Sequence, residues 1–306
     1  VADYLHAGLD RASSDDTRIA TEYFGEIFLF RPPWHYPYVW TLIVFPLSLL
    51  VAAVAGLIAP RSGPLRGLVL VNMAVLYGAL ALPSAPMHDG VRLFLPLFPF
   101  YCALVGSGSV AIGEWVTRAL QVRFPSIAER RDLIVALAIV ACLAPAAIRT
   151  AQIHPYQLSF FNAFVGGVEG AERRGLEVTN LKEVLNREVL EDLVEVLPEG
   201  ALLDPGFFIE EVCFYQAVGW VPAEWRVETQ LSKPDGSDQV ALACEGPASF
   251  ATVALDRTAG AADFVFVLNR KAQWRRTESA LVGFGGAPML EVSLEGVPLL
   301  MVYRTG

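Results

Sequence analysis

The sequence predicts an α-helical membrane bundle of four transmembrane helices, followed by a small α/β domain. Of the 306 residues 54% are hydrophobic and the mean hydropathy is +0.44, which exceeds the usual share in globular proteins. Residues 1–148 contain ten Lys/Arg and ten Asp/Glu, whereas residues 149–306 contain thirteen and twenty-two. The net charge of −9 therefore belongs to the second part. An acidic soluble part argues against a nucleic-acid partner, which requires clustered Lys and Arg.

Four uncharged apolar runs predict the transmembrane helices. Tyr38–Ala59 has 22 residues and Leu93–Gly113 has 21, which is enough to cross about 30 Å of hydrocarbon at about 1.5 Å per residue. Gly67–Ala85 and Leu133–Ile148 are shorter and equally uncharged. The transmembrane region is therefore predicted over residues 38–149, with helices at about 38–59, 67–85, 93–113 and 133–148.

The arginines between these runs indicate the orientation in the membrane. Segments 60–66 and 114–132 contain six arginines, whereas segment 86–92 contains only Arg92, at its edge. Positive residues mark the cytoplasmic side, so residues 1–37, 86–92 and everything after 149 are predicted to be extracytoplasmic. A run of 16 residues such as 133–148 also suits a buried soluble helix, but these flanks favour the transmembrane interpretation.

Residues 150–306 are predicted to form the extracytoplasmic α/β domain. An aromatic-rich segment over 155–164 comes first and is expected at the membrane interface. Apolar residues at helical spacing predict a helix over Leu181–Leu197, which Pro198 and Gly200 end. The further predicted elements are a strand at 201–203, a helix over Phe207–Val218, a turn at 233–237, a strand over Asp263–Asn269, and two strands within 289–303 around Glu295 and Gly296. Alternation of helix and strand is typical of layered α/β domains.

The sequence predicts no metal site. The histidines at positions 6, 35, 88 and 154 lie more than five residues apart, and there is no CxxC, HExxH or P-loop motif. The glycine-rich run 166–170 lacks the preceding strand of a dinucleotide fingerprint and is interpreted as a turn. No cofactor is evident, and dependence on a divalent metal stays undecided.

The four cysteines fall in two environments. Cys102 and Cys142 lie within predicted transmembrane helices and are interpreted as packing residues. Cys213 and Cys244 lie in the predicted extracytoplasmic domain, where oxidation is plausible. They can form a disulfide, or remain two buried thiols that pack as small apolar residues.

Four segments carry a family resemblance. They are PPWHYPY at 32–38, HDGVRLFLPLFP at 88–99, HPYQLSFFNAFVGG at 154–167 and VEGAERRGLEVTNLK at 168–182. In this order they resemble the C-terminal half of bacterial family-39-type glycosyltransferases, relatives of the protein O-mannosyltransferases and of the aminoarabinose transferases of lipid A. The H-P-Y-x-L-S-[FY]-[FY]-N…G-G element is the most specific, and the resemblance weakens over about 200–260.

This resemblance implies the C-terminal part of a GT-C fold in a bacterial inner membrane. Such enzymes transfer a sugar from a polyprenyl-phosphate donor, on the extracytoplasmic face, to a protein, lipid or glycan acceptor. Their catalytic carboxylate lies in the first extracytoplasmic loop, which is expected upstream of this chain, so the chain is expected to be an inactive fragment. Asp15 and Asp16 precede a late helix and are interpreted as loop or cap residues rather than as catalytic ones.

Candidate site residues follow from this expectation. Arg92 and His88, at the outer end of the third predicted helix, are candidates for binding the donor phosphate. Arg92 can instead snorkel at the membrane interface, and His88 shares a helical face with it only if the helix begins before residue 88. Pro86 and Gly90 favour a loop there. Further candidates for an interfacial position or a substrate groove are Trp34, His35, Tyr36, His154, Tyr156 and Asn162, for all of which a structural role is the alternative.

A function of a different class stays open. The chain can be a non-enzymatic, membrane-anchored binding or assembly protein whose domain at 150–306 recruits a partner. A transporter is disfavoured because transporters usually place ionisable or polar residues within their spans, and these four runs have almost none.

Overall fold

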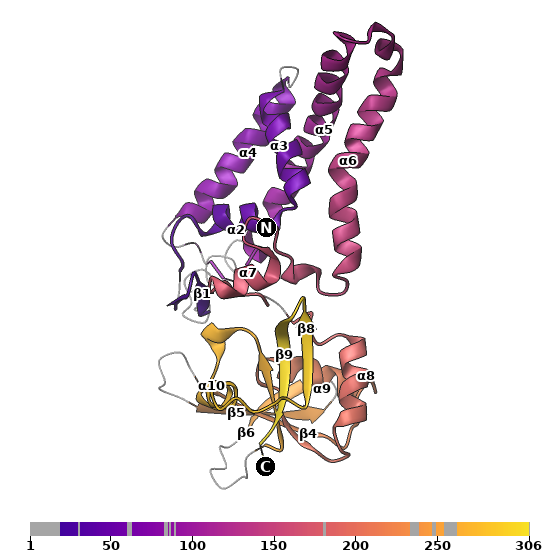
Figure 1. The fold of residues 1–306 in the computed structure, drawn as a ribbon. Helices are drawn as coiled ribbons and strands as arrows, with labels where there is room; N and C mark the ends of the chain where they lie inside the picture. Colours follow the sequence, from indigo (N-terminus) through magenta and orange to yellow (C-terminus); the bar gives the residue numbers. More distant parts are fainter. Residues whose placement is uncertain are drawn as a thin grey trace. The chain divides into compact units, whose positions relative to one another are not determined.

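The computed structural model describes residues 19–305, except for 30, 60–62, 83–84, 86, 89, 180–181, 233–238, 247–248 and 254–261. The protein is of mixed α/β type and divides into two compact units (Figure 1). The first comprises Val1–Ile19 and Phe30–Gly170, and the second comprises Ala20–Leu29 and Ala171–Gly306. Asp15, Asp16 and the predicted turn at 233–237 lie outside the described residues.

The first unit is helical. Its elements are α2 (Tyr36–Val44), α3 (Leu47–Ile58), α4 (Pro64–Ala81), the 3-10 helix η2 (Arg92–Leu97), α5 (Phe98–Gln121), η3 (Pro125–Arg130), α6 (Arg131–Gln152) and η4 (Gln157–Ser159). Helix α7 (Gly167–Arg173) runs across the boundary between the units. The glycine-rich run 166–170, predicted as a turn, is a turn only at its start and then enters α7.

Among the residues that the structure describes, two helices are long and apolar enough to cross a membrane: η2 with α5 over Arg92–Gln121, and α6 over Arg131–Gln152. The pair α2 and α3 can supply a third crossing if it is one broken span. Helix α4 covers most of the predicted span 67–85, but it ranks only as a shorter apolar helix. The structure therefore supports two or three crossings, and the predicted four are not shown. Both long helices also continue past their predicted ends, at Gln121 and at Gln152.

The predicted helix 38–59 is not continuous. It is divided into α2 and α3, whose axes differ by 116°. The break follows from Pro46, because proline has no N–H and disfavours helical backbone at the residue before it. Phe45 is accordingly extended, with φ −87° and ψ 130°, and α3 begins after Pro46.

Helices α3 and α5 pack so closely that their backbones are in contact. A Cβ atom added to Gly108 would lie 1.7 Å from the carbonyl oxygen of Ala52, and one added to Gly56 would lie 2.2 Å from that of Leu104. At the α5–α6 contact, a Cβ on Gly113 would lie 2.7 Å from the Cα of Val135. Only glycine fits at these positions, as is common where membrane helices pack closely.

The second unit is built on a seven-stranded sheet with the order β6-β5-β4-β3-β7-β9-β8. Strand β3 is parallel to β4 and β7, and the other pairs are antiparallel. The strands are β3 (Leu202–Asp204), β4 (Arg226–Ser232), β5 (Gln239–Gly246), β6 (Ser249–Val253), β7 (Phe264–Leu268), β8 (Leu290–Leu294) and β9 (Val297–Arg304). The helices are α8 (Arg187–Val196), η5 (Gly206–Phe208), α9 (Ile209–Ala217), η6 (Lys271–Gln273) and α10 (Arg276–Gly283).

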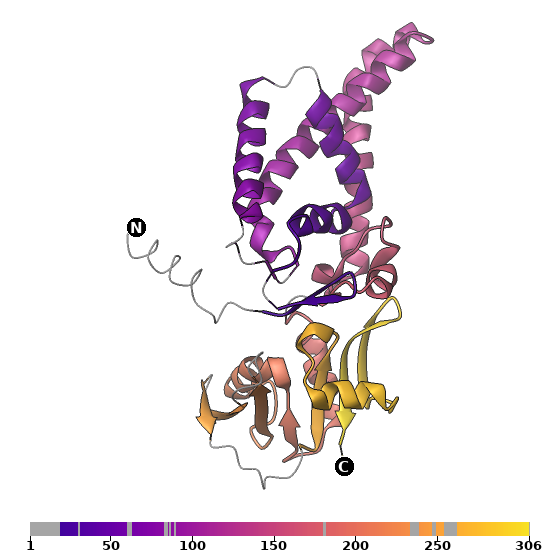
Figure 2. The ribbon, with the colours of Figure 1, turned by 90° about the vertical axis from the view of Figure 1, so that its left-hand side faces the viewer.

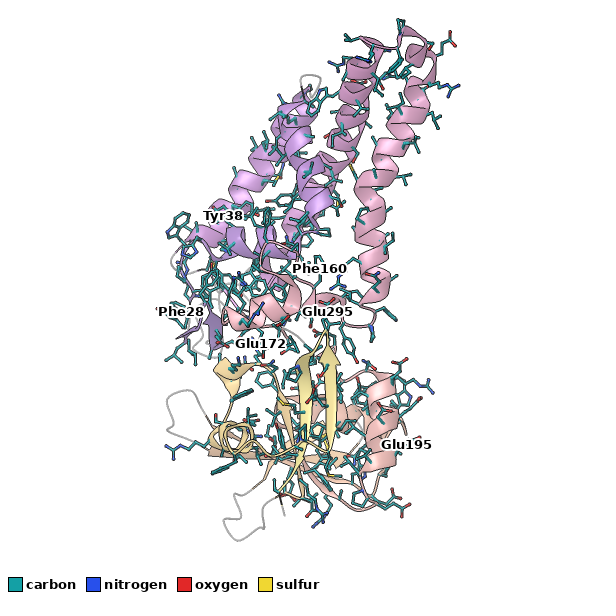
Figure 3. The ribbon with its side chains drawn as sticks, in the orientation of Figure 1. Phe28, Tyr38, Phe160, Glu172, Glu195 and Glu295 are labelled. Atoms are coloured by element: carbon teal, nitrogen blue, oxygen red, sulfur yellow. A yellow bond between two sulfur atoms is a disulfide. The ribbon has the colours of Figure 1, made fainter. Side chains whose placement is uncertain are left out.

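Several predicted elements are present in the second unit. The predicted strands at 201–203 and 263–269 correspond to β3 and β7, and the predicted helix 207–218 corresponds to η5 and α9. The two strands within 289–303 are β8 and β9, joined at Glu295 and Gly296, which both have positive φ (51° and 80°) as in a type I′ hairpin turn (Figure 3).

Other elements differ from the prediction. Helix α8 begins at Arg187 rather than near residue 181, because the Asn186 side chain accepts hydrogen bonds from the N–H groups of Glu188 and Val189 and so caps the helix. The segment 1–37, predicted as a loop, contains the antiparallel hairpin of β1 (Thr21–Tyr23) and β2 (Glu26–Phe28), which belongs to the second unit (Figure 2).

Buried charges join α10 to the sheet. Arg275, at the start of α10, donates through Nη1 to both carboxylate oxygens of Asp204 (3.1 and 3.0 Å) and through Nη2 to Glu278 (2.9 Å). Thr229 of β4 donates to Asp204 at 2.6 Å. Burial by itself lowers the pKa of Arg275, but the hydrogen bond that it donates to Glu278 and the charges of both carboxylates outweigh this effect and raise that pKa above its ordinary value.

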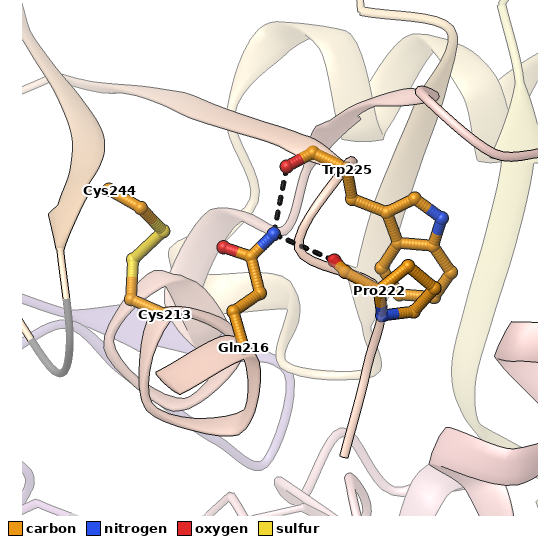
Figure 4. The surroundings of a disulfide bond; sticks show 5 residues. All are labelled: Cys213, Gln216, Pro222, Trp225 and Cys244. Carbon is orange, nitrogen blue, oxygen red and sulfur yellow. Dashed lines mark hydrogen bonds between the residues drawn. A yellow bond between two sulfur atoms is a disulfide. The ribbon is translucent and has the colours of Figure 1, made fainter. Parts of the chain in front are cut away.

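Cys213 of α9 and Cys244 of β5 form a disulfide, with Cα atoms 5.5 Å apart (Figure 4). The pairing that the sequence left open is therefore present. Beside it, Gln216 donates to the carbonyl oxygens of Pro222 (3.1 Å) and Trp225 (2.8 Å), which fixes the chain after α9. Cys102 and Cys142 are free.

Candidate functional site

An apolar cavity of about 230 Å³ lies between the end of α4 and η2 in the first unit. Among its lining residues are Leu76 and Leu80 of α4, Ala85, and Leu93, Phe94 and Leu97 of η2. Pro96, which also lines it, interrupts the helix, and Phe94 has non-helical backbone angles (φ −115°, ψ 15°). Irregular backbone at membrane depth is tolerated where it is buried in protein or lines a cavity.

Arg92 and His88 flank this cavity along the chain. Arg92 is the exposed first residue of η2, directly before the lining residue Leu93. His88 is half-buried in the loop before η2, and Gly90 between them has a positive φ of 56°. Because the helix begins after residue 88, the two side chains do not share a helical face, in line with the loop that Pro86 and Gly90 favoured.

Arg31 is a second cation that contacts the end of α4, beside one lining residue of the cavity, and the sequence analysis missed it. Its Nη2 donates to the carbonyl oxygens of Leu80 (3.2 Å) and Ala81 (2.9 Å) at the end of α4, where carbonyl groups have no partner within the helix. Leu80 also lines the cavity. The available signal was position, since Arg31 directly precedes the PPWHYPY segment.

The predicted aromatic residues at 34–36 divide between surface and core. Trp34 is 66% exposed, and its ring centroid lies 5.8 Å from that of His35 and 6.0 Å from that of Tyr38. Tyr36 is fully buried and its ring lies 5.7 Å from that of Trp40. Trp34 and His35 can therefore contact an interface or a ligand, whereas Tyr36 is a packing residue of α2. Figure 3 labels Tyr38, the neighbour of Trp34.

A chain of hydroxyl groups joins α2, α4 and α5. Thr41 donates to the Pro37 carbonyl at 2.8 Å and lies 2.9 Å from the Tyr77 hydroxyl, which lies 2.8 Å from that of Tyr101. Since the single hydroxyl proton of Thr41 goes to Pro37, Tyr77 must donate to Thr41, and Tyr101 must donate to Tyr77. The Tyr38 ring stacks on Tyr77, with centroids 4.5 Å apart. Each hydroxyl proton therefore has an acceptor in an apolar region, where an unpaired one is costly.

His154 and Tyr156 lie in the segment after α6. His154 is exposed, and its Nδ1 lies 2.8 Å from Gln157 Nε2. Because an amide nitrogen donates, Nδ1 accepts, and the neutral imidazole carries its proton on Nε2. Tyr156 is half-buried.

Asn162 stabilises the break between α2 and α3. Its Nδ2 donates to the carbonyl oxygens of Leu42 (2.6 Å) and Phe45 (2.8 Å), and its backbone N–H donates to Ile43 (2.8 Å). In a continuous helix the Leu42 carbonyl would pair with the N–H of residue 46, which is proline and has none. Both Nδ2 protons are used and Oδ1 accepts from the Phe164 N–H at 2.9 Å, so these hydrogen bonds support a structural role for Asn162, which is the alternative to a place in a groove.

Among the residues that the structure describes, no group of three or more His, Cys, Asp and Glu is placed to hold a metal ion. Comparison of the chain with protein-family models, with curated proteins and with solved structures gave no match. The functional argument therefore rests on the residues and on the geometry of this cavity.

Proposed function

We propose that this chain is part of a membrane glycosyltransferase of the GT-C class, which transfers a sugar from a polyprenyl-phosphate donor on the extracytoplasmic face of a bacterial inner membrane. The observation that carries the proposal is the apolar cavity with Arg92 beside Leu93 and Arg31 beside Leu80. Such a donor combines an apolar tail with an anionic phosphate. An apolar cavity next to guanidinium groups suits both parts.

The chemistry of arginine supports this assignment. Guanidinium offers a planar fork of donors that fits phosphate oxygens, and it stays charged at any working pH. Arg92 is the better candidate for the phosphate because it is exposed and directly precedes the lining residue Leu93. The disulfide in the second unit supports an oxidising, extracytoplasmic compartment for that unit. The acceptor sugar, lipid or protein is not part of the proposal.

The proposal places the catalytic carboxylate outside these 306 residues. The isolated chain should therefore show no transferase activity with a polyprenyl-phosphate sugar. Turnover by the isolated chain would mean that the catalytic group lies within it and that this part of the proposal is wrong.

Donor binding is tested with Arg92 variants of the full-length protein. One charge-assisted contact contributes about 1.5–3 kcal/mol, so Arg92→Ala should weaken donor affinity roughly 10–100-fold. Arg92→Lys should keep part of the affinity, because the charge survives without the fork. The matched control is Arg123→Ala, an exposed arginine after α5, which should leave donor affinity unchanged.

Normal expression with unchanged donor affinity in Arg92→Ala would leave Arg92 as a snorkelling residue. That result would favour the rival class, a membrane-anchored binding or assembly protein without enzymatic activity.

A further inference from the structure

The β1–β2 hairpin of the second unit presents apolar side chains on its outward face. Thr21 and Tyr23 of β1 are buried, at 0% and 2% exposure, and burial raises the pKa of Tyr23 to about 12. Ile27 pairs with Glu22, between these two residues, so the side chains of Ile27 and of the part-exposed Glu22 point to the opposite face, as does that of Leu29 two residues later. Ile27 is 56% exposed, Leu29 58% and the turn residue Phe24 47%. The outward face of such a hairpin is normally polar when it meets water.

The hairpin is held firmly to its unit. The Gly25 N–H donates to the Gly175 carbonyl at 3.0 Å, and the Glu22 N–H donates to the Glu177 carboxylate at 3.0 Å. A Cβ on Gly175 would lie 2.2 Å from Gly25 N, so the two backbones are in direct contact. Phe24 has a positive φ of 53°, which is uncommon for a bulky residue. The apolar side chains are thus fixed in exposed positions.

The covalent chain limits the distance between this hairpin and Trp34. Leu29 is five residues before the exposed Trp34, and five residues span at most about 18 Å. Trp34 lies two residues before α2, where the apolar helical region begins, and tryptophan is enriched at membrane–water interfaces. Residues 19–30 contain Glu22 and Glu26 but no Lys or Arg, so any attraction to a bilayer must come from the apolar side chains rather than from charge.

We propose that the outward face of the β1–β2 hairpin, on which Ile27 and Leu29 lie, inserts into the interfacial layer of the phospholipid bilayer. The hairpin then acts as a lipid anchor for the second unit. This inference is independent of the proposed enzymatic function, because it depends only on the exposed side chains, their fixed backbone and the length of chain to Trp34. Since the attraction is apolar, a zwitterionic bilayer suffices and added salt does not release the hairpin.

The test uses the full chain in phosphatidylcholine nanodiscs. In a Cys102→Ala/Cys142→Ala background, which keeps the Cys213–Cys244 disulfide, Ile27→Cys and Leu29→Cys are labelled with an environment-sensitive fluorophore. The matched control is Phe284→Cys, an 89% exposed position of the same unit. We expect emission at positions 27 and 29 to shift to shorter wavelength, to be quenched by lipids brominated in the acyl chain, and to resist quenching by aqueous iodide.

Three outcomes are distinguishable. Quenching by brominated lipid at positions 27 and 29 but not at 284 supports the lipid anchor. Protection from iodide without quenching by brominated lipid would show that protein covers the face, and it would overturn the proposal. Iodide access equal to that of the position-284 control would show a face in water, which also overturns it.

Discussion

Helix α6 of the first unit exposes its apolar side chains, whereas helix α8 of the second unit buries them. Of the 22 residues of α6 only Cys142 is buried, while Leu133, Leu137, Val140 and Ile148 are each more than half exposed. Helix α8 buries Val189, Leu190 and Leu193 and directs charged residues such as Glu195 outward (Figure 3). An apolar face as large as that of α6 would be a liability in water, whereas in lipid it is the expected surface. The two units are therefore built for different solvents.

The interactions that stabilise the two units also differ. In the first unit, glycine contacts such as Gly108 to Ala52 and the neutral chain from Tyr101 to Thr41 hold the helices together. In the second unit, Arg275 bridges Asp204 and Glu278, and a disulfide joins α9 to β5. Charges are expensive within a bilayer, and apolar side chains gain no hydrophobic driving force there, so close packing replaces both.

The largest expected effect is at Gly108 in the first unit. In Gly108→Ala the new Cβ would lie 1.7 Å from a backbone oxygen of Ala52, and backbone cannot yield as a side chain would. Helices α3 and α5 must then separate, at a cost above about 4 kcal/mol, which single substitutions reach only rarely. Thermal unfolding in detergent should show a large loss in Tm.

The matched control lies two residues away on the same helix. A Cβ at Gly106 meets no atom within 4 Å, so Gly106→Ala should be neutral or should stabilise by up to about 1 kcal/mol through helix propensity. Equal Tm values for the two alanine variants would show that α3 and α5 do not depend on backbone contact.

The next largest effect is expected in the second unit, at its disulfide. Cys213 and Cys244 are 31 residues apart, and closing a loop of that length stabilises by about 3–4 kcal/mol in the chain-entropy model. The Cys213→Ser/Cys244→Ser variant should lose about this much, seen as faster hydrogen exchange in β4, β5 and α9. Cys102→Ser, which removes an exposed free thiol, should have no effect. Four reactive thiols in the denatured protein without reductant would contradict the bond itself.

A somewhat smaller effect is expected at Arg275. Arg275→Met leaves Asp204 and Glu278 without their shared counter-ion, and breaking a buried pair in this way costs about 3–5 kcal/mol. We expect the lower end, about 3 kcal/mol, because Arg275 and Asp204 each keep 16% side-chain exposure. Hydrogen exchange in β3 and α10 should accelerate. Arg276→Met, at an exposed neighbouring position, should change stability by less than about 0.5 kcal/mol.

The contrast between the units also separates what the sequence could predict from what it could not. Local signals predicted the long apolar helices, β7, and the turn at Glu295 and Gly296, since these depend on periodicity and on nearby turn residues. Pro46 and Asn186 are local signals as well. Pro46 breaks the predicted helix 38–59, and Asn186 delays the start of α8. Neither signal was recognised, because each lies among apolar residues that predict one continuous helix. The sequence did not predict the β1–β2 hairpin, because its strands have only three residues each.

The candidate site could be predicted only in part, for a physical reason. Arg92 was found because its position along the chain is informative. The contacts of Arg31 with Leu80 and Ala81 join residues 49 and 50 positions apart, and no local pattern encodes them. His88 and Arg92 were named together because both precede the third predicted helix, but sequence position alone does not show whether two loop residues converge, and Gly90 between them has a positive φ.

The smallest expected effect distinguishes a structural role from a binding role at Asn162. Asn162→Ala leaves the carbonyl groups of Leu42 and Phe45 without the donors that they have in the native protein. An unsatisfied buried acceptor costs about 1–3 kcal/mol, so Tm should fall modestly. Asn72→Ala is the control, because Asn72 is partly exposed and its Nδ2 donates to the Leu68 carbonyl within its own helix.

Asn162→Asp sharpens this test. A carboxylate would place an oxygen against the carbonyl oxygens of Leu42 and Phe45, so this variant should be at least as destabilised as Asn162→Ala. If Asn162 bound a substrate instead, the two substitutions would lower the activity of the full-length protein while leaving Tm unchanged. A fall in Tm that is larger for aspartate than for alanine would show that Asn162 stabilises the break between α2 and α3. The segment 154–167 that contains it would then have a structural role in the first unit.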